Sequence, residues 1–344
     1  MTENVDDQSW LSQSMETFKS WIKDTEEVIA SQSSINPLDD SEVDTLINRI
    51  KEVLALKLNL RQISIMAESI TVLANVVVNW SVALKDAVVY ILRTLVAQFL
   101  MFNEEEVLIK EVNDDVLEAV TQCCQLPEIK RILLNEMSEE ILCIVIDNPS
   151  RIWLSKSWLK LYNFMVQDVS KKMREELGRH LTQYIEYLVD MMYSFGEYDM
   201  QSSLVEALLR LSEKKRRSEL ALAWFPNYAL VQSLFCGIKD FEVDCRSFLN
   251  AFNKGLGPNQ LVHSLVVESC SVGNNQVYKP TSSKYLQFWI DFNLGSKNIS
   301  VYYISTEDSA ELWELLIIDS YSTNVVNLTA GIGGFCSLLF CLPD

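Results

Sequence analysis

Residues 286–303 read LQFWIDFNLGSKNISVYY and mark a change in the spacing of apolar residues along the chain. Before the turn, apolar residues occupy every second position: Leu286, Phe288, Ile290, Phe292 and Leu294. Alternation with a period of two is typical of a β-strand with one buried face. Turn residues follow at Gly295–Asn298, and the alternation resumes at Ile299. The stretch therefore predicts a β-hairpin.

Further strands are expected on both sides of this hairpin. The helical period ends at the segment Gly255-Leu256-Gly257-Pro258, and residues 261–267, 312–318 and 321–328 have strand character. We therefore predict a small antiparallel β domain over residues 256–344. Its last part, residues 330–342, is apolar and glycine-rich and fits neither period. It is either a buried final strand or a chain end that does not belong to the domain.

The part of the chain before this domain is expected to be helical. It has no glycine before Gly178, whereas eight of the ten glycines lie between Gly237 and Gly334. A long glycine-free run suits stacked helices, because sheets need turn residues. Apolar residues at helical spacing predict helices near 43–54, 63–80, 89–99, 114–124, 128–146, 156–170, 173–195, 203–213 and 218–236. We favour an armadillo- or HEAT-like α-solenoid over residues 1–255, with a closed helical bundle as the alternative. The predicted class is α+β, mostly α.

The composition excludes several classes of protein. Of the 344 residues, 49% are hydrophobic and only 17 are Gly or Pro, so the chain can bury a core and is not a disordered protein. Its formal net charge of −18 argues against direct reading of DNA, which requires a cationic surface. The most apolar stretch, residues 72–102, is interrupted by polar and charged side chains. We therefore expect no membrane-spanning helix.

The cysteines and histidines give little support to an enzyme or a metal site. None of the eight cysteines forms a CxxC pair, and most lie in apolar runs, so we expect buried, reduced thiols and an intracellular protein. Cys123 and Cys124 are adjacent and would point in different directions on a helix. The two histidines, His180 and His263, lie in different predicted domains, and no phosphate loop or nucleophile elbow occurs. We expect no catalytic residues, no metal, no cofactor and no small-molecule substrate.

The densest positive run is the main candidate for a binding site. Lys214, Lys215, Arg216 and Arg217 are consecutive in an otherwise acidic chain. Such a run can be a nuclear-import signal or a contact for an acidic partner. Alternatively, it is a solvated helix end whose cations lie near the last carbonyl groups of a helix.

Aromatic residues crowd the region that joins the two predicted domains. These are Trp224, Phe225, Phe235, Phe241, Phe248 and Phe252. Large rings at helical spacing are more often core than ligand site. We expect them to form an interface that fixes the β domain against the last helices.

Several of these stretches resemble one known family. Residues 213–225 (EKKRRSELALAWF), residues 240–250 (DFEVDCRSFLN) and residues 288–296 (FWIDFNLGS), followed by Ser300–Tyr303, are similar to the N-terminal region of the synaptonemal complex protein 2 family, including its 2-like paralogue. The resemblance covers residues 205–318, whereas residues 10–204 match mainly in helical pattern.

The resemblance implies both a fold and a function. It implies an armadillo-like helical domain followed by a pleckstrin-homology-like β domain similar to the middle domain of the large FACT histone-chaperone subunit. It also implies a nuclear, chromosome-associated, non-enzymatic scaffold of the meiotic chromosome axis, or lateral element, that binds axis or centromere proteins. The alternative is a histone-binding chromatin module that uses acidic segments such as residues 104–115.

Two departures from the family pattern affect this expectation. The pattern fades after Ile318, so the pleckstrin-like domain is expected to be truncated or atypical beyond that point. Family members continue into a coiled coil that assembles with synaptonemal complex protein 3, and the 344 residues contain no heptad segment. We expect this chain to correspond to the front portion of a longer architecture.

Overall fold

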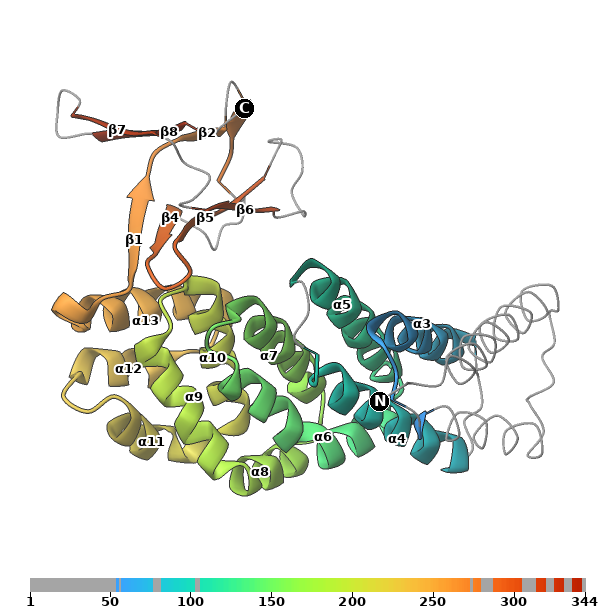
Figure 1. Ribbon diagram of the computed structural model, residues 1–344. Coiled ribbons are helices and arrows are strands. Elements are labelled where there is room, and N and C mark those ends of the chain that lie inside the picture. Colours follow the sequence, from blue (N-terminus) through green and yellow to red (C-terminus); the bar gives the residue numbers. More distant parts are fainter. Residues whose placement is uncertain are drawn as a thin grey trace. The chain divides into compact units, whose positions relative to one another are not determined.

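A computed structural model describes residues 54–55, 57–76, 82–102, 106–272, 275–279, 287–304, 314–319, 325–330 and 336–341. Two compact units make up the chain, Met1–Met173 and Arg174–Asp344, and each is considered by itself. The predicted helix near 43–54 lies almost entirely outside the described residues. The described part of the chain is mostly helical, with a small antiparallel sheet of four strands (Figure 1).

In the first unit, the described elements are consecutive helices. They are α3 (Leu60–Val76), α4 (Val82–Phe99), α5 (Glu106–Cys123), α6 (Pro127–Asp147) and α7 (Ile152–Gln167). Helix α3 packs against α5, α4 packs against α6, and α5 packs against α7, so each of these helices contacts the second helix after it in the chain. The indole of Trp158 in α7 is fully buried and donates a hydrogen bond of 2.9 Å to Asn113 of α5. This bond satisfies the indole N–H inside an otherwise apolar core.

Shorter helices form the start of the second unit. α8 (Lys171–His180) crosses the boundary between the units, and α9 (Thr182–Ser194), α10 (Tyr198–Leu211), the 3₁₀ turn η1 (Lys214–Arg216), α11 (Arg217–Trp224), α12 (Ala229–Gly237) and α13 (Phe241–Gly255) follow. A reciprocal pair of amide hydrogen bonds joins Gln201 of α10 to Asn253 of α13, at 3.1 and 2.7 Å. Both amides are buried, and each satisfies the other.

Two of the predicted helices are each two helices in the structure, and one helix was not predicted. The segment 173–195 is interrupted at Leu181, and the segment 218–236 is interrupted between Trp224 and Ala229. The second break has a local cause, because Pro226 disfavours a helical residue before it and Asn227 adopts a left-handed φ of 69°. The helix that the sequence did not single out is α13.

After a short 3₁₀ turn (η2, Gly257–Asn259), the described chain contains strands only. The four-stranded sheet has the order β1-β4-β5-β6, and its strands are β1 (Val262–Val267), β4 (Phe288–Asn293), β5 (Asn298–Tyr303) and β6 (Glu314–Asp319). Every neighbouring pair is antiparallel. The predicted hairpin is confirmed, with Lys297 in its turn at a φ of 54°. The strands predicted at 261–267 and 312–318 are also confirmed, with ends shifted by one or two residues.

Two further strand pairs complete the described residues. β2 (Cys270–Val272) pairs with β3 (Asn275–Val277), and β7 (Val325–Ala330) pairs with β8 (Cys336–Cys341), both antiparallel. The strand predicted at 321–328 thus lies a few residues later, at β7. Residues 336–341 of the apolar segment 330–342 form strand β8, which agrees with the first of its two interpretations in secondary structure, and residues 331–335 and 342 lie outside the described residues.

The two faces of the four-stranded sheet have different roles. One face carries Val267, Phe288, Ile290, Val301 and Leu316, which form a small apolar core with Val277 of β3. The opposite face carries polar side chains that are also buried, namely Asp291, Asn293 and Ser300. An alternating strand usually turns its polar residues to water. Here they are turned to the helices of the same unit.

A buried ion pair joins the helices to this polar face. The guanidinium of Arg246 in α13 donates two hydrogen bonds to the carboxylate of Asp291 in β4, at 2.6 and 3.1 Å. The Asp291 side chain is 1% exposed. Ser264 of β1 donates a third bond of 2.6 Å to the same carboxylate. The guanidinium carbon also lies 3.5 Å from the ring centre of Tyr198, so the cation is held by a ring as well as by its counterion.

Further hydrogen bonds fix the hairpin to the start of α10. The backbone N–H of Tyr198 donates to the side-chain oxygen of Asn293 at 2.9 Å, and the Tyr302 hydroxyl donates to Asp199 at 2.9 Å. The turn itself meets the helical part at two glycines, where the Gly295 N–H donates to the Gly196 carbonyl at 3.0 Å. A Cβ at Gly196 would lie 2.5 Å from the Gly295 nitrogen, so this approach requires glycine.

The aromatic cluster has a different role from the one expected. The described ring contacts of Phe225, Phe235, Phe248 and Phe252 are with one another and with Trp224 and Tyr193, at centroid distances of 5.1–6.1 Å. All these residues belong to the helical part of the second unit. The rings therefore form a helical core, and the contacts to the sheet described above are mainly polar.

The first prediction concerns the buried ion pair. Replacing Arg246 by Met leaves the Asp291 carboxylate buried without its cation, so we expect the free energy of unfolding to fall by about 3 kcal/mol. Urea unfolding followed by tryptophan fluorescence measures this. The control is Arg216→Met, which breaks the exposed pair of Arg216 with Glu219 and should leave stability unchanged. Equal effects of the two substitutions would contradict the assignment.

The second prediction concerns the close approach of the two glycines. Gly196→Ala should lower the melting temperature by about 4 °C or more, because the added methyl group forces the hairpin turn away from α10. Gly237→Ala is the matched control, since a Cβ there meets nothing within 4 Å. That variant should melt at the original temperature or slightly above it. Differential scanning calorimetry distinguishes the two, and an unchanged Gly196→Ala protein would refute the argument.

Candidate interaction surfaces

The basic run lies at the junction between α10 and α11. Lys214, Lys215 and Arg216 form the turn η1 and are exposed, whereas Arg217 is half-buried at the start of α11. Lys215 pairs with Glu213 at 2.9 Å, and Arg216 pairs with Glu219 at 3.1 Å. These bonds raise the pKa of Lys215 and of Arg216. The exposed part of the run therefore carries three cations, two of which have carboxylate neighbours.

Arg217 differs from the other three cations. Its guanidinium donates a hydrogen bond of 3.0 Å to the carbonyl oxygen of Leu209, in the last turn of α10. Burial lowers the pKa of Arg217. A cation at the last carbonyl groups of a helix satisfies an acceptor that has no partner in the helix and stabilises the negative end of the helix dipole. The structural alternative considered from the sequence thus describes the environment of Arg217, and residues 214–216 are the part of the run that is exposed.

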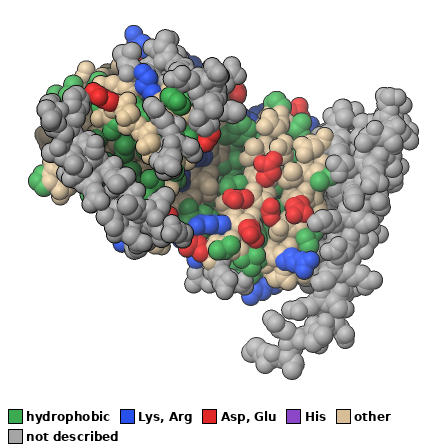
Figure 2. All heavy atoms as spheres, turned by 90° about the horizontal axis from the view of Figure 1, so that it is seen from above, with side chains coloured by type: hydrophobic (Ala, Val, Ile, Leu, Met, Phe, Trp, Pro, Cys, Tyr) green, Lys and Arg blue, Asp and Glu red, His purple; other side chains and the backbone are tan. Residues whose placement is uncertain are grey.

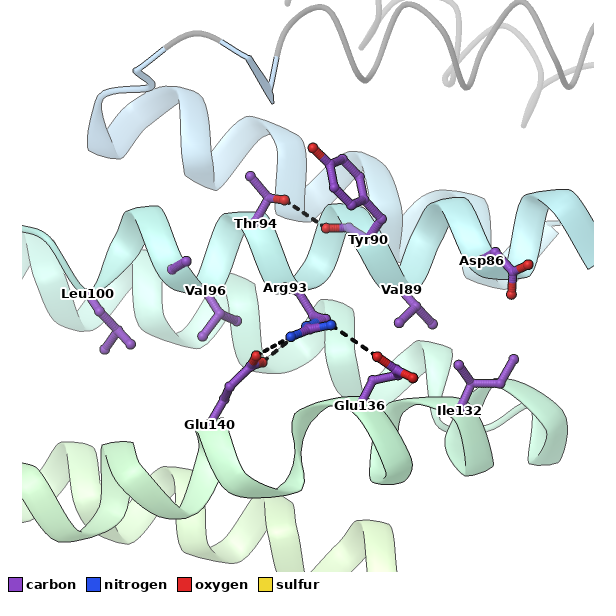
Figure 3. A pocket seen from close by; sticks show the side chains of 11 residues that line it. Asp86, Val89, Tyr90, Arg93, Thr94, Val96, Leu100, Ile132, Glu136 and Glu140 are labelled. Carbon is purple, nitrogen blue, oxygen red and sulfur yellow. Dashed lines mark hydrogen bonds and ion pairs between the residues drawn. The ribbon is translucent and has the colours of Figure 1, made fainter.

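A second surface lies in the first unit, between α4 and α6. It is a groove of about 660 Å³ lined by Asp86, Val89, Tyr90, Arg93, Thr94, Val96, Ala97, Leu100, Ile132, Glu136 and Glu140. In Figure 3, Val89, Val96 and Leu100 point from α4 toward α6, and Ile132 points back from α6. Tyr90 and Thr94 lie on the side away from α6. The lining is mainly apolar, and Leu100 is 41% exposed.

Arg93 lies at the centre of this groove and bridges the two helices. It forms ion pairs with Glu136, at 3.0 Å, and with Glu140, both from α6 (Figure 3). The hydrogen bond to Glu140 raises the pKa of Arg93. Lys85, near the start of α4, pairs instead with Glu128 outside the groove lining. The lining therefore contains three carboxylates and one cation, an excess of two negative charges.

An acidic surface lies on α5 and α3. Glu111 and Asp114 are exposed on α5, Asp115 is half-buried, and Glu68 of α3 is exposed nearby. Burial raises the pKa of Asp115, and Glu68, Asp114 and Glu111 raise it further, so these carboxylates share one region. Figure 2, which looks down on Figure 1 from above, shows Asp and Glu side chains gathered on the face seen there. This surface overlaps the acidic segment 104–115, of which residues 104–105 lie outside the described residues.

The described residues hold no cluster of metal ligands. Within the described ranges, no group of three or more His, Cys, Asp or Glu side chains could hold a metal ion. The six cysteines with described side chains form no disulfide, and Cys123, Cys124 and Cys245 are buried as expected, whereas Cys143, Cys236 and Cys270 are half-buried. Burial raises the pKa of Cys124 and of Cys245 to about 12, so these thiols are poor nucleophiles. None of the described helices combines the length and the apolar character needed to cross a membrane.

The sequence did not single out the groove, although one signal was present. The stretch that becomes α4 is apolar on more than one face, and a helix of that kind is usually buried all round. In the structure, α4 buries Leu92 and Leu95 but leaves Tyr90 and Leu100 largely exposed. The sequence signal of this surface is therefore that α4 has more apolar residues than a single buried face needs. The partner helix α6 and its glutamates could not be assigned from spacing.

Comparison with known proteins shows which proteins this chain is similar to. A family model described as Synaptonemal complex 2 Spt16M-like domain matches residues 262–330. Synaptonemal complex protein 2 of Rattus norvegicus is 31% identical over 204 residues, which is 58% of this chain and 13% of the rat protein. Synaptonemal complex protein 2-like of Mus musculus is 41% identical over 129 residues, or 37% of this chain and 15% of that protein.

Two further comparisons extend the match along the chain. Synaptonemal complex protein 2-like of Xenopus laevis is 30% identical over 240 residues, covering 68% of this chain and 24% of that protein. A solved structure titled Synaptonemal complex protein is 24% identical and covers 88% of this chain and 78% of its own, with a TM-score of 0.66. The likeness to that structure concerns the fold. The match thus spans about a quarter or less of the curated relatives' length.

Proposed function

The chain is a relative of the synaptonemal complex protein 2 family, and we propose that it acts as a non-enzymatic interaction scaffold of the meiotic chromosome axis, or synaptonemal complex lateral element. In this proposal it resides in the nucleus on chromosomes and binds axis or centromere proteins. It reaches DNA through those proteins, because its net charge of −18 opposes direct contact with phosphates.

The observation that carries the proposal is the extent of the similarity. The match to the Xenopus protein covers 68% of the chain, which is far more than the β region at residues 262–330. A scaffold must hold its binding surfaces in fixed positions. The contacts of Arg246, Asn293 and Gly196 with their partners supply this in the second unit, where they join the sheet to α10 and α13.

The finer description of the fold belongs to the same proposal. We propose that residues 1–255 form an armadillo- or HEAT-like helical domain, supported by the packing of successive helices in the first unit. We propose that residues 256–344 form a pleckstrin-homology-like domain, atypical after residue 318, supported by the antiparallel order β1-β4-β5-β6. The helical period ends at Gly255, although the compact second unit begins earlier, at Arg174.

The third prediction tests the basic run as a partner contact. Changing Lys214, Lys215 and Arg216 together to Ser should lower the recovery of axis or centromere proteins from meiotic nuclear extract without changing the melting temperature. These three side chains are exposed, as is Glu219, the partner of Arg216, whereas Glu213, the partner of Lys215, is half-buried with 17% of its side chain exposed. Quantitative mass spectrometry of the recovered proteins measures the effect.

Two further variants make this test specific. Arg217→Ser should lower the melting temperature, because it removes the hydrogen bond to the Leu209 carbonyl. A triple Ser variant of three other exposed cations, Lys57, Arg61 and Arg131, controls for the change in net charge. Equal loss of partners in both triple variants would reject the run as a site. Recovery of no axis, centromere or chromatin protein by the unmodified chain would reject the scaffold proposal.

A second candidate function is histone binding, and the acidic surface of α5 and α3 favours it. Carboxylates at Glu68, Glu111, Asp114 and Asp115 form a negative region that complements basic histone surfaces. This function is compatible with the same fold and would replace axis proteins by histones as the direct partner.

The fourth prediction decides this candidate. If the chain is a histone module, histone H3–H4 should bind at about 150 mM salt, and the double variant Glu111→Gln, Asp114→Asn should weaken binding about tenfold. Isothermal titration calorimetry measures both. The control is Glu186→Gln, Asp190→Asn, on exposed carboxylates of α9. Binding that disappears at this salt concentration, or that falls equally in both variants, indicates non-specific charge attraction.

A further inference from the structure

We propose that the groove between α4 and α6 binds an amphipathic helix of a partner protein, with apolar residues on one face and Lys or Arg beside them. The proposal names one binding surface of the scaffold and so rests on the proposed function. It concerns residues that neither the basic run nor the acidic surface includes.

The length and lining of the groove fit a helix. Its α4 side runs from Asp86 to Leu100, which at 1.5 Å per residue is about 21 Å. A helix of about 14 residues has this length. The floor consists of Val89, Val96 and Leu100 on the α4 side, seven and four residues apart, and of Ile132 from α6. Apolar residues at this spacing accept the ridge of a third helix.

An extended peptide fits the same surface less well. The groove walls are two helices whose own backbone groups are paired within each helix, and the floor is apolar. The backbone N–H and C=O groups of an extended peptide would lie against this floor without partners, which costs free energy. A helix satisfies these groups internally and presents only side chains.

The charges select the kind of helix. Arg93 spans the middle of the groove and is shared by Glu136 and Glu140, and Asp86 adds a third carboxylate at one end. The single cation leaves part of the glutamate charge uncompensated, so a Lys or Arg beside the apolar face of the incoming helix finds carboxylates to pair with. A second copy of this acidic chain would bring mainly like charge to the same place.

The fifth prediction uses a defined probe. A fluorescein-labelled helical peptide of about 18 residues, with leucines at positions i, i+3, i+4 and i+7 and lysines flanking them, should bind the full chain in a fluorescence anisotropy titration. The same peptide with glutamates in place of the lysines should bind at least about tenfold more weakly. Failure of the lysine peptide to bind, or equal affinity of both peptides, would overturn the proposal.

Variants then locate the binding. Leu100→Asp should weaken the lysine peptide at least about tenfold, while Leu222→Asp, at an exposed leucine of α11 outside the groove, should not. Glu136→Lys should reduce the preference for the lysine peptide over the glutamate peptide. The melting temperature of each variant is measured in parallel. Ala97→Arg, which places a bulky cation at an exposed position of the lining, gives a second block should Leu100→Asp fail to fold.

The outcomes separate this inference from the scaffold proposal. If Leu100→Asp and Ala97→Arg leave peptide binding unchanged but the unmodified chain still recovers axis proteins, the groove inference fails and the scaffold proposal stands. If sedimentation shows that the chain self-associates and Leu100→Asp abolishes this, the occupant is a second copy and the partner helix is rejected. If no axis, centromere or chromatin protein is recovered but the lysine peptide binds specifically, the groove stands without the scaffold role.

Discussion

The second unit depends on one buried ion pair between a helix and a sheet. Arg246 of α13 and Asp291 of β4 meet through two hydrogen bonds, and the carboxylate is almost fully removed from water. A buried charge without a partner costs several kcal/mol, so each group is tolerated only in the presence of the other. The pair therefore requires the sheet to lie against α13 in one register. The guanidinium carbon lies 3.5 Å from the Tyr198 ring centre and 5.5 Å from the Trp289 ring centre, so both rings also attract the cation.

This pair explains why both faces of a small sheet are covered. The face with Phe288 and Val301 has an apolar core of its own, while the face with Asp291 and Asn293 is polar and also buried. Hydrogen bonds from Ser264 and from the Tyr198 backbone satisfy this polar face. Polar contacts of this kind are directional, so they specify orientation more sharply than an apolar contact of the same area. The helices and the sheet of the second unit are thereby joined as one body, and the change from helix to strand falls inside it.

The surfaces proposed for binding are made of other residues than this junction. The exposed cations 214–216 lie between α10 and α11, and the groove lies in the first unit between α4 and α6. In both places, charged groups form ion pairs with near neighbours. The cations 214–216 stay exposed in the first place, and the apolar Leu100 stays exposed in the second. Arg93, for example, holds α4 to α6 and also divides the groove floor. Such surfaces can recognise a partner without any change in the core that supports them.

Local patterns in the chain were enough to predict the class of fold and most of its elements. The alternation at residues 286–303 and the glycine-free run before Gly178 depend only on neighbouring residues, because a period of 2 or 3.6 is a property of the backbone itself. The helix break at Pro226 also depends only on neighbouring residues, although the apolar spacing did not predict it.

The partners of long-range contacts could not be predicted from local patterns. Arg246 and Asp291 are separated by 45 residues, as Trp158 and Asn113 are, and nothing in their spacing identifies them as pairs. The aromatic rings were assigned to the wrong interface for the same reason. Packing decides which buried face meets which, since that choice rests on the complementarity of side chains brought together only when the chain folds.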